Sequence, residues 1–286
     1  MPVGQADFAS FAAEKTQAAA AAPIERLSTN FDGSAAEPVH GVGNEWSRTH
    51  YGGDFNLYVP PDGGPALSLV FVQSKDGNTG AKDPSALGGG PTDEHLIYEG
   101  LSRVAADAVL AGAGSLPRRS LFSVWHPELV ALRASLGLAR HPAQIVVSKE
   151  GRRLDFTSLL FNVPEVPVFL IAGDACLSRH TPALRERPWI RCVPLEGGSI
   201  RTVLEHLRSE PGIRRISAIG GRFTASHLVD AGAAQDLYLT TAPRDGGEPG
   251  TPWYTGPAAP PLRTMTQKQW THRGGRILFE HILIAR

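Results

Sequence analysis

The chain has 286 residues, and its 28 lysine and arginine side chains balance 28 aspartate and glutamate side chains. This length is sufficient for one large domain or two small ones with a sizeable core. The balanced charge gives no electrostatic reason to expect nucleic acid or an anionic membrane as a partner. Two cysteines, Cys176 and Cys192, are too few for a disulfide scaffold and too isolated for a zinc site, so no metal is predicted.

Residues 1–64 differ in composition from the rest of the chain and are predicted to form an N-terminal extension. Residues 8–22 are alanine-rich and have helical propensity, whereas residues 23–51 are rich in Gly, Ser, Asn and His without steady periodicity. We expect this extension to lie over the following domain or over a partner subunit. Four aromatic side chains are expected to anchor it by packing, or else to cover a substrate: Trp46, Tyr51, Phe55 and Tyr58.

Hydropathy gives an expectation about location. No apolar run approaches the length of a membrane span. Glu14 and Lys15 interrupt the apolar stretch nearest the N-terminus, which argues against a signal peptide. We therefore predict a cytoplasmic protein.

The first part of the following domain alternates between strand and helix signals. Residues 66–73, ALSLVFVQ, have the length and β-branched content of a strand. Thr92 is predicted to cap the next helix, with Asp93 in its first turn, where the helix dipole favours an acid. Its inward-facing residues at helical spacing are Ile97, Leu101, Val104 and Ala108. A strand at 107–111 then leads into a glycine turn at 112–115.

The second part continues the alternation. A helix is predicted at 127–136, because a proline begins it and a glycine follows it, and Ser199 is predicted to cap a later one. Short apolar strands are predicted at 144–148, 168–172, 190–193, 216–219 and 237–242. Residues 267–285 resemble a closing hairpin that turns near Gly274-Gly275. Residues 65–286 are therefore predicted to form one α/β domain with a largely parallel sheet and antiparallel strands at one edge.

The turn at Gly220-Gly221 carries the clearest functional signal. It follows the strand 216–219 and precedes a short helix, which Thr224 is predicted to cap and Gly232 to end. Free amide groups and the helix dipole point the same way at such a turn, so we expect it to bind the phosphates of a dinucleotide, although the same pattern also occurs as plain architecture. Ligands bind beyond the carboxyl ends of strands in α/β sheets, and three predicted strands carry suitable turns there, after Gln73, Ala111 and Ile219.

Three blocks of sequence together resemble a known family. FVQSKDG at 71–77, RVAADAVLAGAGSL at 103–116 and IGGRFTASHLVDAGAAQDLYLTTAP at 219–243 are similar, in this order, to the reductase domain of riboflavin biosynthesis. That domain is the C-terminal part of a bifunctional deaminase/reductase. The resemblance covers residue 65 to the C-terminus. It implies a dihydrofolate-reductase-like fold, NADPH as cofactor and a homodimer.

The resemblance also implies roles for particular residues. Gln73 would lie along the cofactor, and the Ser115 hydroxyl would touch its ribose or phosphate side. Arg222 would pair with the extra phosphate of NADPH or face solvent. The full set of implied cofactor contacts is Gln73, Gly112, Ser115, Gly220, Gly221, Arg222, Phe223, Thr224 and Ala225.

The substrate side is implied by fewer residues. Asp76 would lie near the nicotinamide and the substrate, where it would orient the substrate or pass a proton; a turn residue before Gly77 is the alternative. Ser74 and Arg103 would contact the substrate, and an arginine meets phosphate oxygens with two parallel hydrogen bonds. Arg103 is equally interpretable as a cation in the last turn of a helix.

The sequence departs from the family pattern on the substrate side. Ile219 stands where the family usually has an acidic residue before the paired glycines. PRRSLFSVWHPEL at 117–129 replaces the usual acidic-proline-leucine-threonine-arginine run, and the zinc signature of the deaminase is absent from the sequence. The cofactor side therefore matches the family better than the substrate side.

Two functional hypotheses follow. The first is an NADPH-dependent reductase that transfers hydride to a C=N bond of a pyrimidine- or pterin-like substrate. The second is a nucleotide-binding protein of the same fold that is non-catalytic or repurposed and acts through residues 1–64. Nucleotide binding with or without turnover separates the two.

Overall fold

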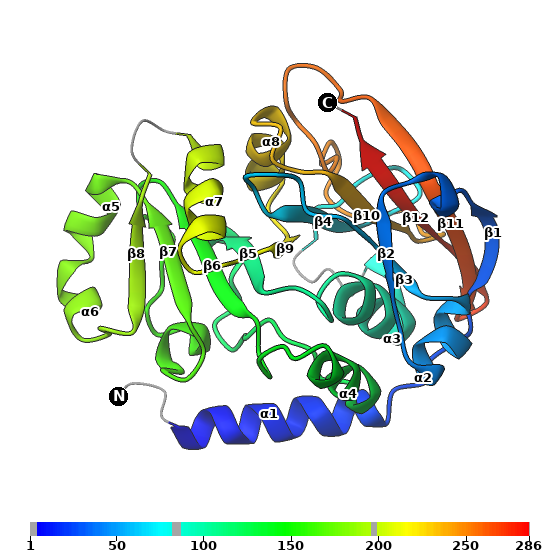
Figure 1. The fold of residues 1–286 in the computed structure, drawn as a ribbon, viewed down its shortest axis with the longest axis horizontal. Helices are drawn as coiled ribbons and strands as arrows, with labels where there is room; N and C mark the ends of the chain where they lie inside the picture. Colours follow the sequence, from blue (N-terminus) through cyan, green and yellow to red (C-terminus); the bar gives the residue numbers. More distant parts are fainter. Residues whose placement is uncertain (1–4, 82–86, 196–198, 286) are drawn as a thin grey trace.

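The computed structural model describes residues 5–81, 87–195 and 199–285. Ten strands within these ranges form a single sheet, in the order β1-β11-β12-β10-β4-β9-β5-β6-β7-β8 (Figure 1). The sheet strands are β1 (Ser28–Asp32), β4 (Ala66–Gln73), β5 (Ala108–Gly112), β6 (Ala143–Ser148), β7 (Val168–Ala172), β8 (Ile190–Pro194), β9 (Arg215–Ile219), β10 (Asp236–Thr241), β11 (Leu262–His272) and β12 (Gly275–Ile284). A separate hairpin consists of β2 (Val39–Val42) and β3 (Phe55–Tyr58).

Seven neighbouring strands, from β10 to β8, run parallel, whereas β12, β11 and β1 add antiparallel pairs at one end. The β11–β12 hairpin turns at Arg273 and Gly274, both with positive φ, 49° and 77°, as a two-residue turn of this hand requires. The predicted mostly parallel sheet with a C-terminal antiparallel hairpin is therefore confirmed.

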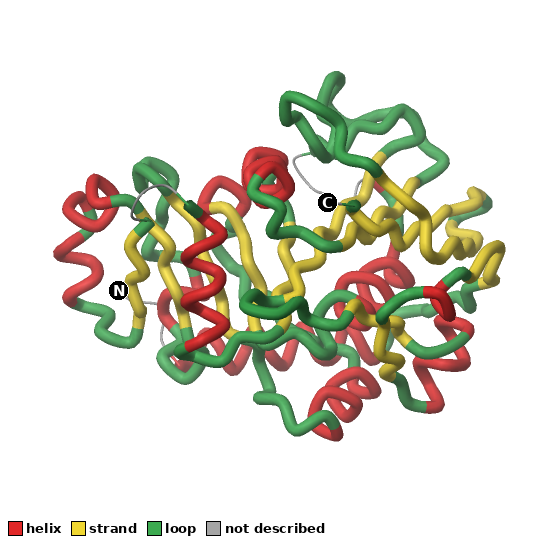
Figure 2. The backbone as a smooth tube through the Cα atoms, turned by 45° about the horizontal axis from the view of Figure 1, so that its top comes forward, coloured by secondary structure: helices red, strands yellow, loops and turns green. Residues whose placement is uncertain are grey.

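Helices cover both faces of the sheet (Figure 2). They are α1 (Gln5–Ala20), α2 (Glu45–Ser47), α3 (Gly90–Thr92), α4 (Pro127–Ser135), α5 (Asp174–Arg179), α6 (Thr181–Arg185), α7 (Ile200–Ser209) and α8 (Arg222–Asp230). The helix α3 continues without a break as a wider π-helical segment, Asp93–Leu101, and the whole is called helix 90–101 below.

Successive side chains along each strand point to opposite faces of the sheet, so the core forms one layer on each face. On one face, Leu67, Leu69 and Phe71 of β4 pack with apolar side chains of α7 and α8. On the other face, Val70 packs with helix 90–101, with α4 and with residues of the N-terminal extension. Burial of these side chains is the main source of stability, because apolar area removed from water is worth about 25 cal/mol per Å².

Three predicted helix boundaries are wrong. Thr92 does not cap its helix, which begins two residues earlier at Gly90 with Gly89 as the N-cap. The helix expected to continue to Val104 and Ala108 ends at Leu101, where Ser102 donates to the Ile97 carbonyl five residues back, and Ala108 begins β5. Gly221, not Thr224, is the N-cap of α8, because its positive φ of 81° turns the chain into the helix three residues earlier. Ser199 caps α7 as predicted, and its side chain accepts from the Thr202 amide.

The N-terminal extension is more ordered than the sequence indicates. Its strand β1 pairs with β11 and adds an edge to the sheet, and α1 lies beside α4 (Figure 1). Tyr51 and Phe55 are buried, at 3% and 0% exposure, and Trp46 stacks on His126 with ring centroids 4.1 Å apart. The strand was not predicted because all five of its residues are exposed, so no alternation marks it.

The end of helix 90–101 depends on one buried cation. Arg133 of α4 is 2% exposed and donates to the carbonyls of Arg103, Val104 and Ala106, and also to that of Ala139. We expect Arg133→Met to lower the free energy of unfolding by about 3 kcal/mol, because several buried carbonyls lose their donor. Urea denaturation measures this change.

The matched control is Arg185→Met at the exposed end of α6, where we expect a change below about 0.5 kcal/mol. Equal denaturation midpoints for the two variants would show that the Arg133 guanidinium does not stabilise this turn.

Candidate functional site

The carboxyl ends of the parallel strands meet at one edge of the sheet, and two clefts open there. The first, of about 320 Å³, is lined by turns after β5 and β6 and by the start of α8, and we call it the glycine cleft. The second, of about 570 Å³, lies beyond β4 and β10 and is called the arginine cleft. Because β4 lies beside β9, and β9 beside β5, the clefts are neighbours along the sheet edge.

The glycine cleft exists because two glycine turns touch. A Cβ atom at Gly112 would lie 2.6 Å from the Thr224 hydroxyl oxygen, too close for any side chain. A Cβ atom at Gly221 would lie 3.1 Å from the Ser115 hydroxyl oxygen. Gly220 and Gly221 also have φ of 65° and 81°, which favours glycine. The turns after β5 and β9, far apart in sequence, are thus brought into contact.

The start of α8 presents its amide groups toward this cleft. The first helical hydrogen bond runs from the Ala225 amide to the Gly221 carbonyl, 2.9 Å, so the amides before it have no acceptor within the helix. Phe223 is 77% exposed at the cleft, which places an aromatic ring at its wall. Arg153 also lines the cleft, with its guanidinium beside Gly114, whereas Arg152 pairs with Glu150 at 2.6 Å. This is an arrangement that binds anions.

The arginine cleft contains a buried acid. Asp93 is 5% exposed, and its Oδ1 accepts a 2.5 Å hydrogen bond from the Thr240 hydroxyl of β10. Burial raises the pKa of Asp93 to about 7, because the charged form loses its hydration; the Thr240 hydrogen bond opposes this shift and the Glu94 charge adds to it. A carboxyl that titrates near neutral pH can give and take protons under physiological conditions.

Cationic side chains line the same cleft. Arg103, Arg244 and Arg273 line the arginine cleft together with His272 and Tyr98. The Arg103 guanidinium lies 5.6 Å from the ring centroid of Tyr98, and its Nε is buried without a hydrogen-bond partner in the part of the chain that the structure describes. Burial lowers the pKa of Arg103. Three guanidinium groups beside a titratable carboxyl suit a substrate that carries an anionic group and accepts a proton.

The residues predicted for the cofactor are largely brought together. Gly112, Ser115, Gly221, Phe223 and Thr224 line the glycine cleft, and Gly220 lies beside Ser115. The side-chain amide of Gln73, at the end of β4, donates to the Thr241 hydroxyl of β10 at 3.0 Å. Arg222 is half-buried and is not among the residues that line either cleft, and the Ala225 amide already has its acceptor within the helix. The cofactor role of all nine stays a prediction.

The residues predicted for the substrate are less well grouped. Arg103 lines the arginine cleft. Ser74 is fully buried, and its hydroxyl accepts from the Asn78 amide at 3.3 Å within the turn after β4. Asp76 is exposed in that turn, just before Gly77, and is not among the residues that line either cleft. Their roles also remain predictions.

Sequence reasoning missed the acid of the arginine cleft. Asp93 was expected only as a favourable residue of a first helical turn. A signal was available, because Asp93, Ile97 and Leu101 are spaced by four, so the aspartate belongs to the inward-facing stripe. Arg244 and Arg273 had no such signal, since they come from loops that only the sheet order brings beside helix 90–101.

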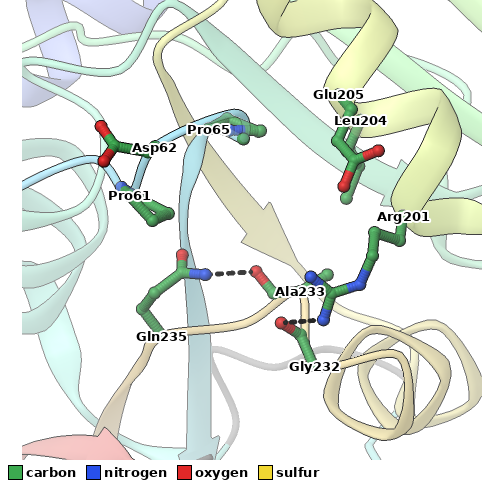
Figure 3. A pocket seen from close by; sticks show the side chains of 10 residues that line it. Pro61, Asp62, Pro65, Arg201, Leu204, Glu205, Gly232, Ala233 and Gln235 are labelled. Atoms are coloured by element: carbon green, nitrogen blue, oxygen red, sulfur yellow. Dashed lines mark hydrogen bonds between the residues drawn. The ribbon is translucent and has the colours of Figure 1, made fainter.

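A third cavity, at the opposite end of β4, is only about 50 Å³ in volume (Figure 3). Its polar groups bond internally: Gln235 donates to the Ala233 carbonyl and accepts from the Leu67 amide, and Arg201 donates to the Gly232 carbonyl. These hydrogen bonds connect the start of β4 and the segment that precedes β10 with α7, so we assign this cavity a structural role.

Within residues 5–81, 87–195 and 199–285, none of the helices has the length and apolar character of a membrane span. No group of three or more His, Cys, Asp or Glu side chains in these ranges is placed to hold a metal ion.

The sequence matches the family model described as the RibD C-terminal domain over residues 65–279. No curated protein matches the chain. Similar solved structures include a pyrimidine reductase-like protein from Corynebacterium diphtheriae, with a TM-score of 0.60 and 18% identity over 78% of this chain and 92% of that one.

Two other similar structures are named for riboflavin synthesis. RibD of Acinetobacter baumannii has a TM-score of 0.53 and 14% identity, over 78% of this chain and 58% of that one. The riboflavin biosynthesis reductase of Saccharomyces cerevisiae has a TM-score of 0.51 and 14% identity, over 78% of this chain and 91% of that one. At these identities the similarity shows the fold alone, and it confirms the fold class that the resemblance implied.

The raised pKa of Asp93 predicts a pH-dependent stability. Between about pH 4 and pH 7 the folded chain keeps a proton on Asp93 that the unfolded chain has released, so this group's contribution to the free energy of unfolding falls as pH rises through that window. The Asp93→Asn variant has no ionisable group at this position and therefore loses this pH-dependent contribution to the free energy of unfolding. The stability of the variant relative to the original chain should therefore increase from pH 4 to pH 7 and level off above it, as measured by urea denaturation.

Asp76→Asn is the control, because this carboxylate is exposed in the turn after β4 and its removal should give no comparable trend. A pH-independent difference between the Asp93→Asn variant and the original chain would contradict the raised pKa.

Proposed function

Because the chain belongs to the RibD C-terminal domain family, we propose that it is an NADPH-dependent reductase that transfers hydride to a C=N bond of a pyrimidine- or pterin-like substrate. Family membership and the reductase neighbours support an oxidoreductase of the riboflavin-pathway type. The observation that carries the finer proposal is the pair of neighbouring clefts: one has amide groups and glycines suited to a diphosphate, and the other has a buried acid among arginines.

The residues of the glycine cleft fit NADPH. The absence of side chains at Gly112 and Gly221 lets Thr224 and Ser115 approach these turns, which brings the first turn of α8 to the cleft where a diphosphate would bind. Arg153 at the cleft wall offers a guanidinium to the additional phosphate that separates NADPH from NADH. The exposed Phe223 ring offers a stacking surface to a base.

When bound, NADPH supplies the hydride, and the chain's own residues supply position and a proton. Reduction of a C=N bond adds the hydride to carbon and a proton to nitrogen. Protonated Asp93 donates that proton and regains one from solvent, while Thr240 holds its carboxyl in place at 2.5 Å. Arg103, Arg244 and Arg273 bind an anionic group of the substrate and thereby orient it.

Asp76 is a second candidate for the proton, which it would pass through water from the exposed turn after β4. The two acids make different predictions, because burial raises the pKa of Asp93 to about 7. A reaction that needs protonated Asp93 slows as pH rises through about 7.

The decisive experiment compares Asp93→Asn with Asp76→Asn in steady-state NADPH oxidation, using the phosphoribosylamino-pyrimidine of flavin synthesis and a dihydropteridine panel. We expect Asp93→Asn to lower kcat about 100-fold or more, and Asp76→Asn to lower it less than about threefold. Thr240→Val should move the alkaline fall of the rate to higher pH, because the Thr240 hydrogen bond lowers the pKa of Asp93.

The opposite ranking of the two variants would assign the proton to Asp76. If the rate of the Thr240→Val variant falls at the same alkaline pH as that of the original chain, Asp93 is not the proton donor.

The cofactor site has its own test. Gly221→Ala places a methyl group against the Ser115 hydroxyl and should weaken NADPH binding at least tenfold, as measured by calorimetry. Gly212→Ala is the matched control, because Gly212 has a similar φ of 73° but open space around its Cβ position. Equal NADPH affinity in the two variants would place the nucleotide elsewhere.

The alternative function is nucleotide binding without catalysis, with residues 1–64 contacting a partner. Tight NADPH binding with no turnover across the substrate panel would favour it. No binding of NADPH or NADH would reject both functions.

A further inference from the structure

We propose a second ligand site, for a small organic ammonium ion with an apolar body, between α1 and helix 90–101. A cavity of about 340 Å³ lies there, apart from the two clefts at the strand ends. Its lining comes from residues 15–23, from one side of helix 90–101 and from Trp125. Residues 15–23 of this lining precede the family match at 65–279, so the site goes beyond the proposed reductase function and does not rest on it.

One part of the wall is apolar. Alanine side chains from the last turns of α1 face the cavity together with Pro23, Pro91 and the indole of Trp125. Trp125 is 4% exposed and is held in place by Phe11, whose ring meets it edge-on at 5.5 Å. Such a wall favours an aromatic or aliphatic body of modest size.

The floor of the cavity is polar and buried. Glu99 is 1% exposed, and its Oε2 accepts from the amides of Trp125 and His126 at 2.8 and 2.9 Å. His95 is 4% exposed, and its Nδ1 lies 3.3 Å from the same Oε2 without hydrogen-bond geometry. Nδ1 of His95 therefore has no hydrogen-bond partner in the described part of the chain, although buried polar atoms normally have one.

An ammonium group would satisfy these atoms. Its N–H donors can reach the Glu99 carboxylate, and also Nδ1 of His95 in the tautomer that carries its proton on Nε2, and both then accept hydrogen bonds. The surroundings favour a positive charge, since Glu94 lines the same cavity and the carbonyl end of α1 adds partial negative charge. Lys15 is an opposing cation, but it is exposed and lies 3.9 Å from Glu94. Arg103 and Arg140 also interact with Glu99, but neither lines this cavity.

The cavity shares a wall with the arginine cleft. Pro91 and Glu94 line both, on the helix that carries Asp93. A molecule bound beneath α1 therefore contacts the same helix that contributes to the larger cleft.

Binding is tested by calorimetry on the full chain without nucleotide, so that the result is independent of reductase activity. The probes are 2-phenylethylammonium, the neutral 2-phenylethanol and the anionic phenylacetate, which share a body and differ in the charge of the head group. We expect the ammonium probe to bind at least tenfold more tightly than the alcohol, and phenylacetate more weakly still.

Two variants locate the site. Ala18→Phe, at an exposed position that lines the cavity, should weaken binding of the ammonium probe at least tenfold, whereas Ala13→Phe, exposed on the same helix but outside the lining, should leave it within twofold. Glu99→Gln keeps an acceptor for the two amides and should abolish the preference for the ammonium probe over the alcohol.

Three results would each overturn the proposal: no saturable binding of the ammonium probe, equal affinity for the alcohol, or undiminished binding in the Ala18→Phe variant. If Ala18→Phe does not fold, the Glu99→Gln comparison decides alone.

Discussion

The hydrogen bond between Thr240 and Asp93 is the contact on which the candidate site depends. It ties helix 90–101 to β10 across a sequence separation of 147 residues. The carboxyl that it holds is buried, and this burial raises the pKa of Asp93 to about 7 against the opposing effect of the hydrogen bond. The packing of helix 90–101 against β10 therefore determines both where the Asp93 carboxyl lies and at which pH it ionises. A carboxyl on the surface of the same helix would be held less firmly and would remain ionised at neutral pH.

The N-terminal extension contacts the start of helix 90–101, next to Asp93. The Glu25 amide donates to the hydroxyl of Thr92 at 2.9 Å, and Thr92, fully buried, directly precedes Asp93. The strand β1 also lengthens the sheet beyond β11. These contacts lie outside the family match, yet they hold the helix that lines the larger cleft. The extension is thus part of the packing around the site, even though nothing in its composition marks it as such.

The sequence was sufficient to predict those features of the fold that depend on neighbouring residues along the chain. Strand β4 was predicted to the residue, because a run of apolar and β-branched side chains buried on both faces has a plain signature. The glycines at 112, 220 and 221 were identified because tight turns leave few alternatives. The arginine cleft was not predicted, since Asp93, Arg244 and Arg273 meet only through the order of strands, and a sequence does not state which loops become neighbours. Strand β1 was missed for the opposite reason: it is an exposed edge strand without any buried side.

In the proposed function, the two clefts bind negative charge by different chemistry, and this difference is reflected in the residues that line them. In the glycine cleft the donors are backbone amides, which are placed by the fold and need only the absence of side chains, so glycine is required. In the arginine cleft the donors are side chains on three separate elements, whose positions depend on the whole tertiary structure. The chain has equal numbers of acidic and basic side chains, so this local positive field arises from placement and not from composition. A cofactor site built from backbone tolerates much change in the surrounding sequence, whereas a substrate site built from side chains changes with each substitution. The two departures from the family pattern, at Ile219 and at residues 117–129, are not among the residues that line the arginine cleft, so they leave its three arginines in place.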